Sequence, residues 1–198
     1  MANLDKTAGM RPIKNLNGSP WNGKVNMYYK AAGLAEAMFV GTPVQLAGSA
    51  DDTGKYPTIK LAGTDPIIGV IVGFCNTPYV AANLTDLDSE HSPVSTASYV
   101  CVCDDPGVIF EMQQEASTTD LDADDIGLNA SPTTESGNTT TGLSTVVIDY
   151  SSINTTSTLS LRIMRLVDKV DNALGDYAKF EVMINNHGLG QGLGSAGV

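Results

Sequence analysis

The stretch ASYVCVCDDPGVIFEMQ, residues 97–113, decides the fold class of this chain. Valine alternates with tyrosine and cysteine over residues 99–103, which is the period of two expected for a pleated strand, and a second apolar run follows at residues 108–112. Four residues with turn chemistry separate the two runs: Asp104, Asp105, Pro106 and Gly107. Aspartate can hydrogen-bond the nearby backbone, proline presets its torsion and glycine accepts a positive one. The stretch therefore predicts a β-hairpin with a structural turn, not a catalytic one.

The composition extends the strand prediction to the rest of the chain. Of the 198 residues 42% are hydrophobic but only 6% are aromatic, so small and branched apolar side chains must build the core. Such side chains, together with abundant glycine, favour short strands and turns over long helices. Further apolar or alternating runs lie at residues 66–74, 146–150, 159–166 and 177–185. We expect an all-β protein with little helix, whose β-rich domain covers residues 36–186.

The N-terminal residues 1–35 differ from this domain because their apolar residues follow no regular period. We expect them to form an extended N-terminal arm. Its large side chains are candidate partner-binding residues, since tryptophan and tyrosine anchor many protein interfaces: Trp21, Met27, Tyr28 and Tyr29. Either the arm reaches a neighbouring subunit, or it folds back and Trp21 fills a pocket of its own domain. Removal of residues 1–30 is expected to leave the β body folded.

The C-terminal residues 187–198 form a Gly-rich tail that is too rich in glycine to pack alone. The tail lacks the Lys-Ser/Thr ending of a phosphate-binding loop, and no strand-to-helix context surrounds it. It therefore predicts no nucleotide site.

Charge and hydropathy weigh against two classes of partner. The formal net charge is -11, so the protein repels a nucleic-acid backbone at long range. The sequence contains no run of about 18 apolar residues, the length that a membrane-spanning helix requires. We expect a soluble protein, made in the cytoplasm, that binds neither nucleic acid nor a membrane.

The cysteines are candidates for a disulfide or a metal site. Cys75, Cys101 and Cys103 are odd in number, and the C-x-C pair on a strand has its Cα atoms about 6.5 Å apart, at the edge of disulfide geometry. We expect three reduced, buried thiols and no zinc site.

An acidic segment invites comparison with a calcium loop through four carboxylates: Asp120, Asp122, Asp124 and Asp125. The EF-hand pattern fails because its sixth and twelfth positions, counted from Asp120, hold Asp125 and Ser131 in place of glycine and glutamate. A first helical turn capped by Thr119 or Asp120 explains the same residues. A structural cation stays open as the alternative.

The sequence also offers little material for catalysis. It has two histidines, His91 in a polar loop and His187 beside the tail, both expected in solvent. It contains no G-x-S-x-G elbow, H-E-x-x-H helix or dinucleotide fingerprint. Asp104 and Asp105 are adjacent on a turn and diverge in direction, so they make a poor acid/base pair. We expect a binding or structural protein without a cofactor, and not an enzyme.

Five blocks in order over residues 38–187 carry a resemblance to a known family: GTPVQL, DPIIGVIVGF, ASYVCVCDDPGVIFEMQ, IGLNASPTTESGNTTTGLSTVVID and LSLRIMRLVDKVDNALGDYAKFEVMINNH. The chain resembles the cement, or head decoration, proteins of tailed bacteriophages. The most characteristic parts are the turn at Asp104 with its following Phe110-Glu111 pair, and the link at residues 166–172. The family has no catalytic residues to carry over.

The resemblance implies a jelly-roll or β-barrel-like body that binds the outer surface of a capsid. The partner would be a major capsid protein of the HK97-like type, and the protein would span neighbouring capsomers and resist the internal pressure of packaged DNA. Such proteins associate as dimers or trimers, of which we expect the trimer, on the outer surface of the virion. Two alternatives stay open: a β-domain that binds carbohydrate or a host surface, and a hydrolase with a triad that includes His91 or His187.

Overall fold

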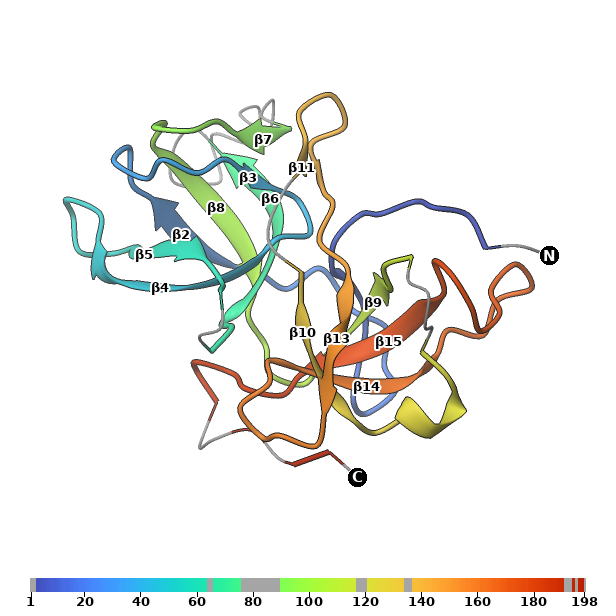
Figure 1. Ribbon diagram of the computed structural model, residues 1–198. Helices are drawn as coiled ribbons and strands as arrows, with labels where there is room; N and C mark the ends of the chain where they lie inside the picture. Colours follow the sequence, from blue (N-terminus) through green and yellow to red (C-terminus); the bar gives the residue numbers. More distant parts are fainter. Residues whose placement is uncertain are drawn as a thin grey trace.

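The computed structural model describes residues 3–63, 66–75, 90–116, 121–133, 137–190, 194 and 196–197 (Figure 1). Regular structure in these residues is almost entirely β-strand, and the one helical element that they contain is a single 3-10 turn, η1 (Ala123–Asp125). No helix in the described ranges is long and apolar enough to cross a membrane. The prediction of an all-β body with little helix is confirmed.

One part of the body is a closed barrel of five strands. In barrel order they are β2 (Asn26–Lys30), β5 (Pro57–Leu61), β4 (Pro43–Ala50), β6 (Gly69–Cys75) and β8 (Ser98–Cys103). The β2 and β5 pair is parallel and the other pairs are antiparallel. Buried side chains of all five strands fill the barrel, among them Tyr28, Val44, Ile59, Ile71, Phe74, Val100 and Val102. One of the two parts of the all-β body is thus a closed barrel.

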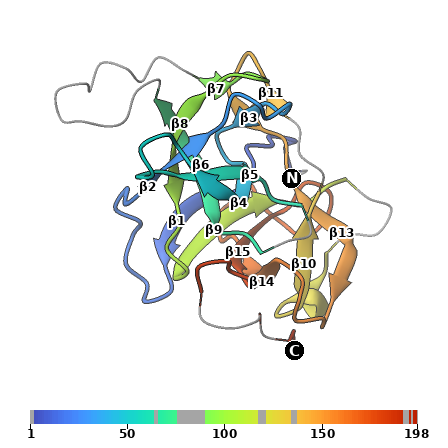
Figure 2. The same ribbon diagram turned by 90° about the vertical axis from the view of Figure 1, so that its left-hand side faces the viewer.

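The other part is an open, antiparallel sheet of six strands that lies below the barrel in Figure 2. Its order is β1 (Arg11–Asn15), β9 (Val108–Gln113), β15 (Lys179–Ile184), β14 (Leu161–Leu166), β10 (Asn129–Pro132) and β13 (Ile148–Asn154). A second cluster of buried side chains packs on this sheet, including Phe110, Leu161, Ile163, Phe180 and Val182. Two short pairs complete the fold: β3 (Met38–Phe39) with β7 (His91–Ser92), and β11 (Gly137–Asn138) with β12 (Leu143–Ser144).

The strands expected at residues 97–113 are present as β8 and β9, but the hairpin prediction is wrong. β8 pairs with β2 and β6 in the barrel, whereas β9 pairs with β1 and β15 in the six-stranded sheet. The acidic turn between them therefore carries the chain from one sheet to the other. Alternation shows that each strand buries one face, and turn residues show where the chain bends, but neither property selects a pairing partner.

The extended N-terminal arm expected for residues 1–35 is also wrong. Strand β1 pairs with β9 from Arg11↔Glu111 to Asn15↔Val108, and β2 pairs with β8 along its whole length. The segment thus supplies one strand to each sheet of its own chain. Each of its two strands is only five residues long, and the ten residues between them have no regular structure except a bridge at Pro20. The alternation within each strand therefore runs over too few residues to stand out in the sequence.

The boundary expected at residue 187 does not separate a tail from the body. His187 is buried and forms a parallel bridge with Ile67, which leads into β6. Farther along, the Gly197 amide donates to the Thr155 carbonyl at 2.9 Å, and the Arg162 guanidinium donates to the carbonyl of Ala196. Glycine-rich chain packs here because neighbouring strands satisfy its backbone groups, a contribution that its own composition does not reveal.

Deletion of residues 1–30 is expected to abolish cooperative folding, because it removes β1 and β2 and opens the barrel between β5 and β8. Far-UV circular dichroism during thermal unfolding of the truncated and intact chains measures this effect. A truncated chain with a sharp transition and native strand content would contradict the integral role of these two strands.

Candidate functional site

The connection at residues 103–108, here named the crossover, is held by its two aspartates in different ways. Asp104 accepts two hydrogen bonds from Asn26 Nδ2, at 2.9 and 3.0 Å, and one from the Tyr28 hydroxyl at 2.7 Å. Asp105 Oδ1 accepts from the Gly107 amide at 2.8 Å and shapes the turn itself. Asp105 therefore has the structural role expected for the turn, whereas Asp104 also fastens the crossover to β2.

The buried side chain of His187 lies close to Asp104 and Asp105 of the crossover. His187 accepts a hydrogen bond from the Leu189 amide at Nδ1, while its Nε2 is buried without a hydrogen bond among the described residues. Burial lowers the pKa of His187, and the nearby Asp104 and Asp105 oppose this shift. The expectation that His187 is a solvated loop residue is wrong, because the bridge to Ile67 places it inside the body.

Trp21 also lies beside the crossover and is half-buried. Its indole Nε1 is buried, makes no hydrogen bond of normal geometry among the described residues, and faces the thiol of Cys103. The ring packs against the apolar core of the six-stranded sheet. Of the two alternatives for Trp21, the structure has the one in which it fills a pocket of its own chain.

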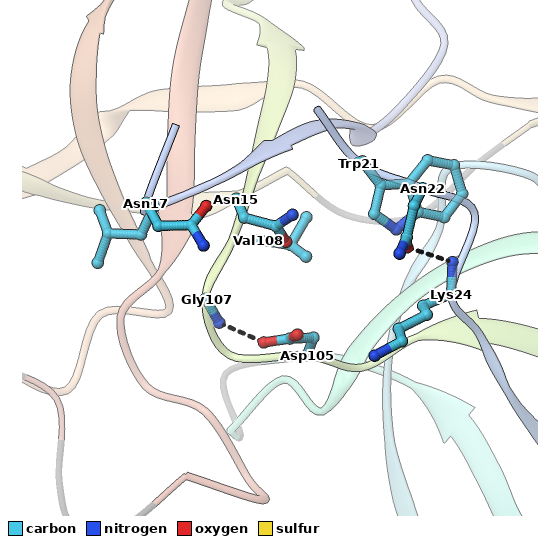
Figure 3. A pocket seen from close by; sticks show the side chains of 9 residues that line it. Asn15, Asn17, Trp21, Asn22, Lys24, Asp105, Gly107 and Val108 are labelled. Atoms are coloured by element: carbon cyan, nitrogen blue, oxygen red, sulfur yellow. Dashed lines mark hydrogen bonds between the residues drawn. The ribbon is translucent and has the colours of Figure 1, made fainter. Parts of the chain in front are cut away.

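A groove of about 570 Å³ opens beside Trp21 and is named the crossover groove. Its walls are side chains of the β1–β2 connection and of the crossover: Asn15, Leu16, Asn17, Trp21, Asn22, Lys24, Asp105, Gly107 and Val108. Figure 3 shows Asn17 on one side of the cavity, Trp21, Asn22 and Lys24 on the other, and Asp105 below. The groove therefore combines amide, ammonium and carboxylate groups with an apolar wall, which is typical of a small-molecule site.

The other residues expected to bind a partner are divided between the inside and the outside of the barrel. Tyr28 is buried in the barrel core, so its assignment to partner binding is wrong. Met27 and Tyr29 alternate with Tyr28 and are half-exposed on the outer face. There Tyr29 pairs with Tyr99 of β8, with ring centroids 5.4 Å apart.

Tyr56 extends this aromatic contact on the outside of the barrel, because its ring lies 5.3 Å from that of Tyr99 in an edge-on arrangement. The Asp51 side chain accepts hydrogen bonds from the amides of Lys55 and Tyr56 and thereby orders the turn that carries Tyr56. No local pattern in the sequence indicates the group formed by Tyr29, Tyr56 and Tyr99. The β2–β8 register brings Tyr29 and Tyr99 together, and the turn ordered by Asp51 adds Tyr56.

The three cysteines are free thiols, as expected, although Cys101 is half-buried and not fully buried. The close pair is Cys75 and Cys101 on neighbouring strands, with Sγ atoms 4.0 Å apart, and not the C-x-C pair. Burial raises the pKa of Cys101 to about 12 and that of Cys103 to about 11. Neither thiol is a reactive thiolate near neutral pH.

The acidic segment forms the expected helical turn with a different cap. Asp122 is the N-cap of η1: its side chain accepts from the Asp124 amide at 2.8 Å, and Asp125 accepts from the Asp122 amide at 3.1 Å. Thr119 and Asp120, the expected caps, lie outside the described residues. Within the described ranges, no group of three or more histidine, cysteine or acidic side chains is placed to hold a metal ion.

Residues 167–178, here named the docking loop, present exposed apolar side chains. Val170 is 98% exposed and Leu174 is 47% exposed, and Leu4 near the N-terminus is 63% exposed. Single exposed apolar residues are common on protein surfaces. A group of exposed apolar side chains on an ordered loop is less common and is typical of protein–protein interfaces.

Two asparagines order the docking loop through side-chain hydrogen bonds to its backbone. Asn172 Nδ2 donates to the carbonyls of Val167 and Lys179, and its Oδ1 accepts from the Lys179 amide. Asn3 Nδ2 donates to the carbonyls of Ala173 and Asp176, and its Oδ1 accepts from the Ala173 amide. The loop is therefore ordered although most of its side chains from Asp168 to Asp176 are exposed.

Comparison of the chain with protein-family models, with curated proteins and with solved structures finds no match.

Substitution of Tyr28 by phenylalanine is expected to lower the free energy of unfolding by about 1.5–3 kcal/mol, the usual contribution of a hydrogen bond to a charged group. The change removes the bond from the hydroxyl to Asp104 and keeps the ring in the barrel core. Urea unfolding measures the effect, and Tyr29→Phe on the outer face of the same strand is the matched control. Equal stability of the two variants would contradict the anchoring role of Asp104.

The buried His187 is expected to make stability depend on pH. Its pKa in the folded protein lies below the unfolded value, about 6.5, so the unfolded chain binds more protons in the window between the two values. Its contribution is present above about pH 6.5 and is lost as the pH falls towards the folded pKa.

Urea unfolding at about pH 7 and about pH 5 measures this dependence. His187→Asn, which keeps an acceptor for the Leu189 amide, should lose less stability on acidification than the wild type. An unchanged pH dependence in His187→Asn would contradict the role of its burial.

Proposed function

We propose that the protein is a non-enzymatic structural protein that binds the outer surface of a phage capsid and cements neighbouring capsomers of an HK97-like major capsid protein against internal DNA pressure. The observation that carries the proposal is the docking loop, an ordered loop that holds Val170 almost fully in solvent. Residues 167–172 of this loop belong to one of the two parts of the chain whose resemblance to cement proteins is most characteristic.

The order of the docking loop favours binding because little conformational entropy is lost when a partner covers it. Tyr177 has φ of 59°, a left-handed conformation that persists only where surrounding contacts impose it. The loop is also fastened to the six-stranded sheet by an ion pair from Lys169 Nζ to Glu111 at 2.6 Å. A tip supported in this way can transmit load from a partner into the sheet.

The chemistry around the tip indicates the kind of surface that it fits. Three exposed carboxylates surround the apolar side chains: Asp168, Asp171 and Asp176. The complementary surface is an apolar depression on the capsid with a basic rim, since opposite potentials favour encounter and like charges oppose it. The overall negative charge suits a protein that must remain soluble until it meets this surface.

Neighbouring copies are proposed to associate on the outer surface of the virion, with the trimer favoured over the dimer. Each copy then needs only a modest interface, because attachment of one copy raises the effective concentration of the next contact. The raised pKa values of Cys101 and Cys103 and the burial of His187 argue against nucleophilic catalysis.

Substitution of Val170 by aspartate is expected to weaken attachment to cognate capsids about tenfold or more, because burial of a valine side chain contributes about 1.5–3 kcal/mol and a buried carboxylate costs further free energy. Cosedimentation of the purified protein with undecorated capsids measures attachment. Val94→Asp is the matched control. It introduces the same charge at another exposed valine, 54% exposed, in the segment between β7 and β8.

Loss of attachment in Val170→Asp, with retention in Val94→Asp, is the expected result, and thermal unfolding checks that both variants are folded. Full retention of Val170→Asp on the capsid would contradict docking through this loop. Failure of the wild-type protein to bind cognate capsids would overturn the proposed function itself.

A further inference from the structure

We infer that the crossover groove is a binding site for a short, neutral saccharide, a function separate from capsid attachment. The groove lies beside Trp21, between the connection from β1 to β2 and the crossover from β8 to β9. Its volume of about 570 Å³ lies within the range typical of small-molecule sites, about 300–1,000 Å³.

The groove offers an apolar wall of the kind that the C–H face of a sugar ring contacts. The accessible part of the Trp21 ring forms this wall, and Leu16, which is 58% exposed, lies at its edge, while Val108 is buried beneath the groove. The orientation of Trp21 is set by core packing and by burial of Nε1 against Cys103, so a ligand meets a ring that is already placed. An aromatic ring with limited freedom contributes contact area at low entropic cost.

Three polar side chains of the groove each accept a hydrogen bond within the protein through one oxygen atom, and each keeps a second polar atom for a ligand. Asn17 Oδ1 accepts from Ser19, and Asn22 Oδ1 accepts from the Lys24 amide. Asp105 Oδ1 accepts from the Gly107 amide. In the described part of the chain, the Nδ2 groups of Asn17 and Asn22 and the second oxygen of Asp105 make no hydrogen bond. These groups supply donors and an acceptor in fixed positions.

This combination matches sugar hydroxyls because each hydroxyl both donates and accepts a hydrogen bond. The carboxylate of Asp105 can accept from one hydroxyl, and the amides can donate to others (Figure 3).

The charges of the groove weigh against ionic ligands. Lys24 and Asp105 both line it, and neither forms an ion pair with a described residue. An anion would meet Asp105 and the net charge of -11, and a cation would meet Lys24. A zwitterion such as a free amino acid could pair with both groups, but it would leave much of the volume and the Trp21 wall unused.

Trp21 is the only tryptophan of the chain, so its fluorescence reports on this groove alone. The experiment titrates the full-length protein, without capsids, with glucose, galactose, mannose, N-acetylglucosamine, maltose, lactose and cellobiose, and separately with glycine, glutamate and inorganic phosphate. We expect a saturable change in Trp21 emission with at least one saccharide and none with the three charged compounds. Saturation-transfer NMR of the same mixtures gives a second measurement that does not depend on tryptophan.

Asp105→Asn tests the assignment without loss of the turn, because the asparagine oxygen can still accept from the Gly107 amide. It should weaken saccharide binding about tenfold or more, as expected when a charged hydrogen-bond acceptor is replaced by a neutral one. Asp52→Asn, at an exposed position of the turn that precedes Tyr56, should leave binding unchanged.

The inference is overturned by three results: no saturable response to any saccharide up to its solubility, a response to the amino acids or phosphate alone, or equal saccharide binding by Asp105→Asn and the wild type. Because capsids are absent from the titration, none of these results bears on capsid attachment. Loss of capsid attachment would likewise leave the saccharide inference unaffected.

Discussion

The hydrogen bonds from Asn26 and Tyr28 to the Asp104 carboxylate fix the point at which the chain leaves the barrel for the six-stranded sheet. The chain passes from the six-stranded sheet to the barrel between β1 and β2, and returns between β8 and β9. Because β1 pairs with β9 and β2 pairs with β8, the two passages lie side by side. Asp104 lies on the passage from β8 to β9. Its carboxylate accepts hydrogen bonds from Asn26 and Tyr28 of β2, the strand that follows the passage from β1. This partly buried carboxylate accepts three hydrogen bonds from two donor groups, so the contact holds the start of the crossover against β2.

A third connection reinforces this junction. Ile67, just before β6, bridges to His187, just after β15, with backbone hydrogen bonds on both sides. The barrel and the sheet are thus joined through three segments that are far apart in the sequence. The crossover groove is a consequence, since its walls come from two of these segments and neither sheet forms it alone. Sites between structural units are common because residues from several elements can converge there.

The fold also separates the two surfaces that we assign to binding. The docking loop and the N-terminus lie on the side of the molecule away from the barrel (Figure 1), and the groove lies at the junction with the barrel. Asn3 links the start of the chain to the docking loop, more than 160 residues away in sequence. The residues before β1 therefore contribute by ordering a distant loop and not by reaching out as an arm. An attached protein can keep a second site open when its contacts are separated in this way.

Local patterns in the sequence determined several strands, including β8 and β9, the turn between them, and the all-β class of the body, but they did not indicate β1 and β2. Residues 98–103 and 108–113 are strands because alternating side chains must bury one face, and Asp105 and Gly107 turn the chain by hydrogen bonds between near neighbours. Only the tertiary structure decided which strands pair, so the hairpin and the arm were predicted wrongly. The period of two reports exposure along one strand and carries no information about its neighbour. For the same reason the sequence could nominate Trp21, but the groove around it required the β1–β9 and β2–β8 pairings that bring its walls together.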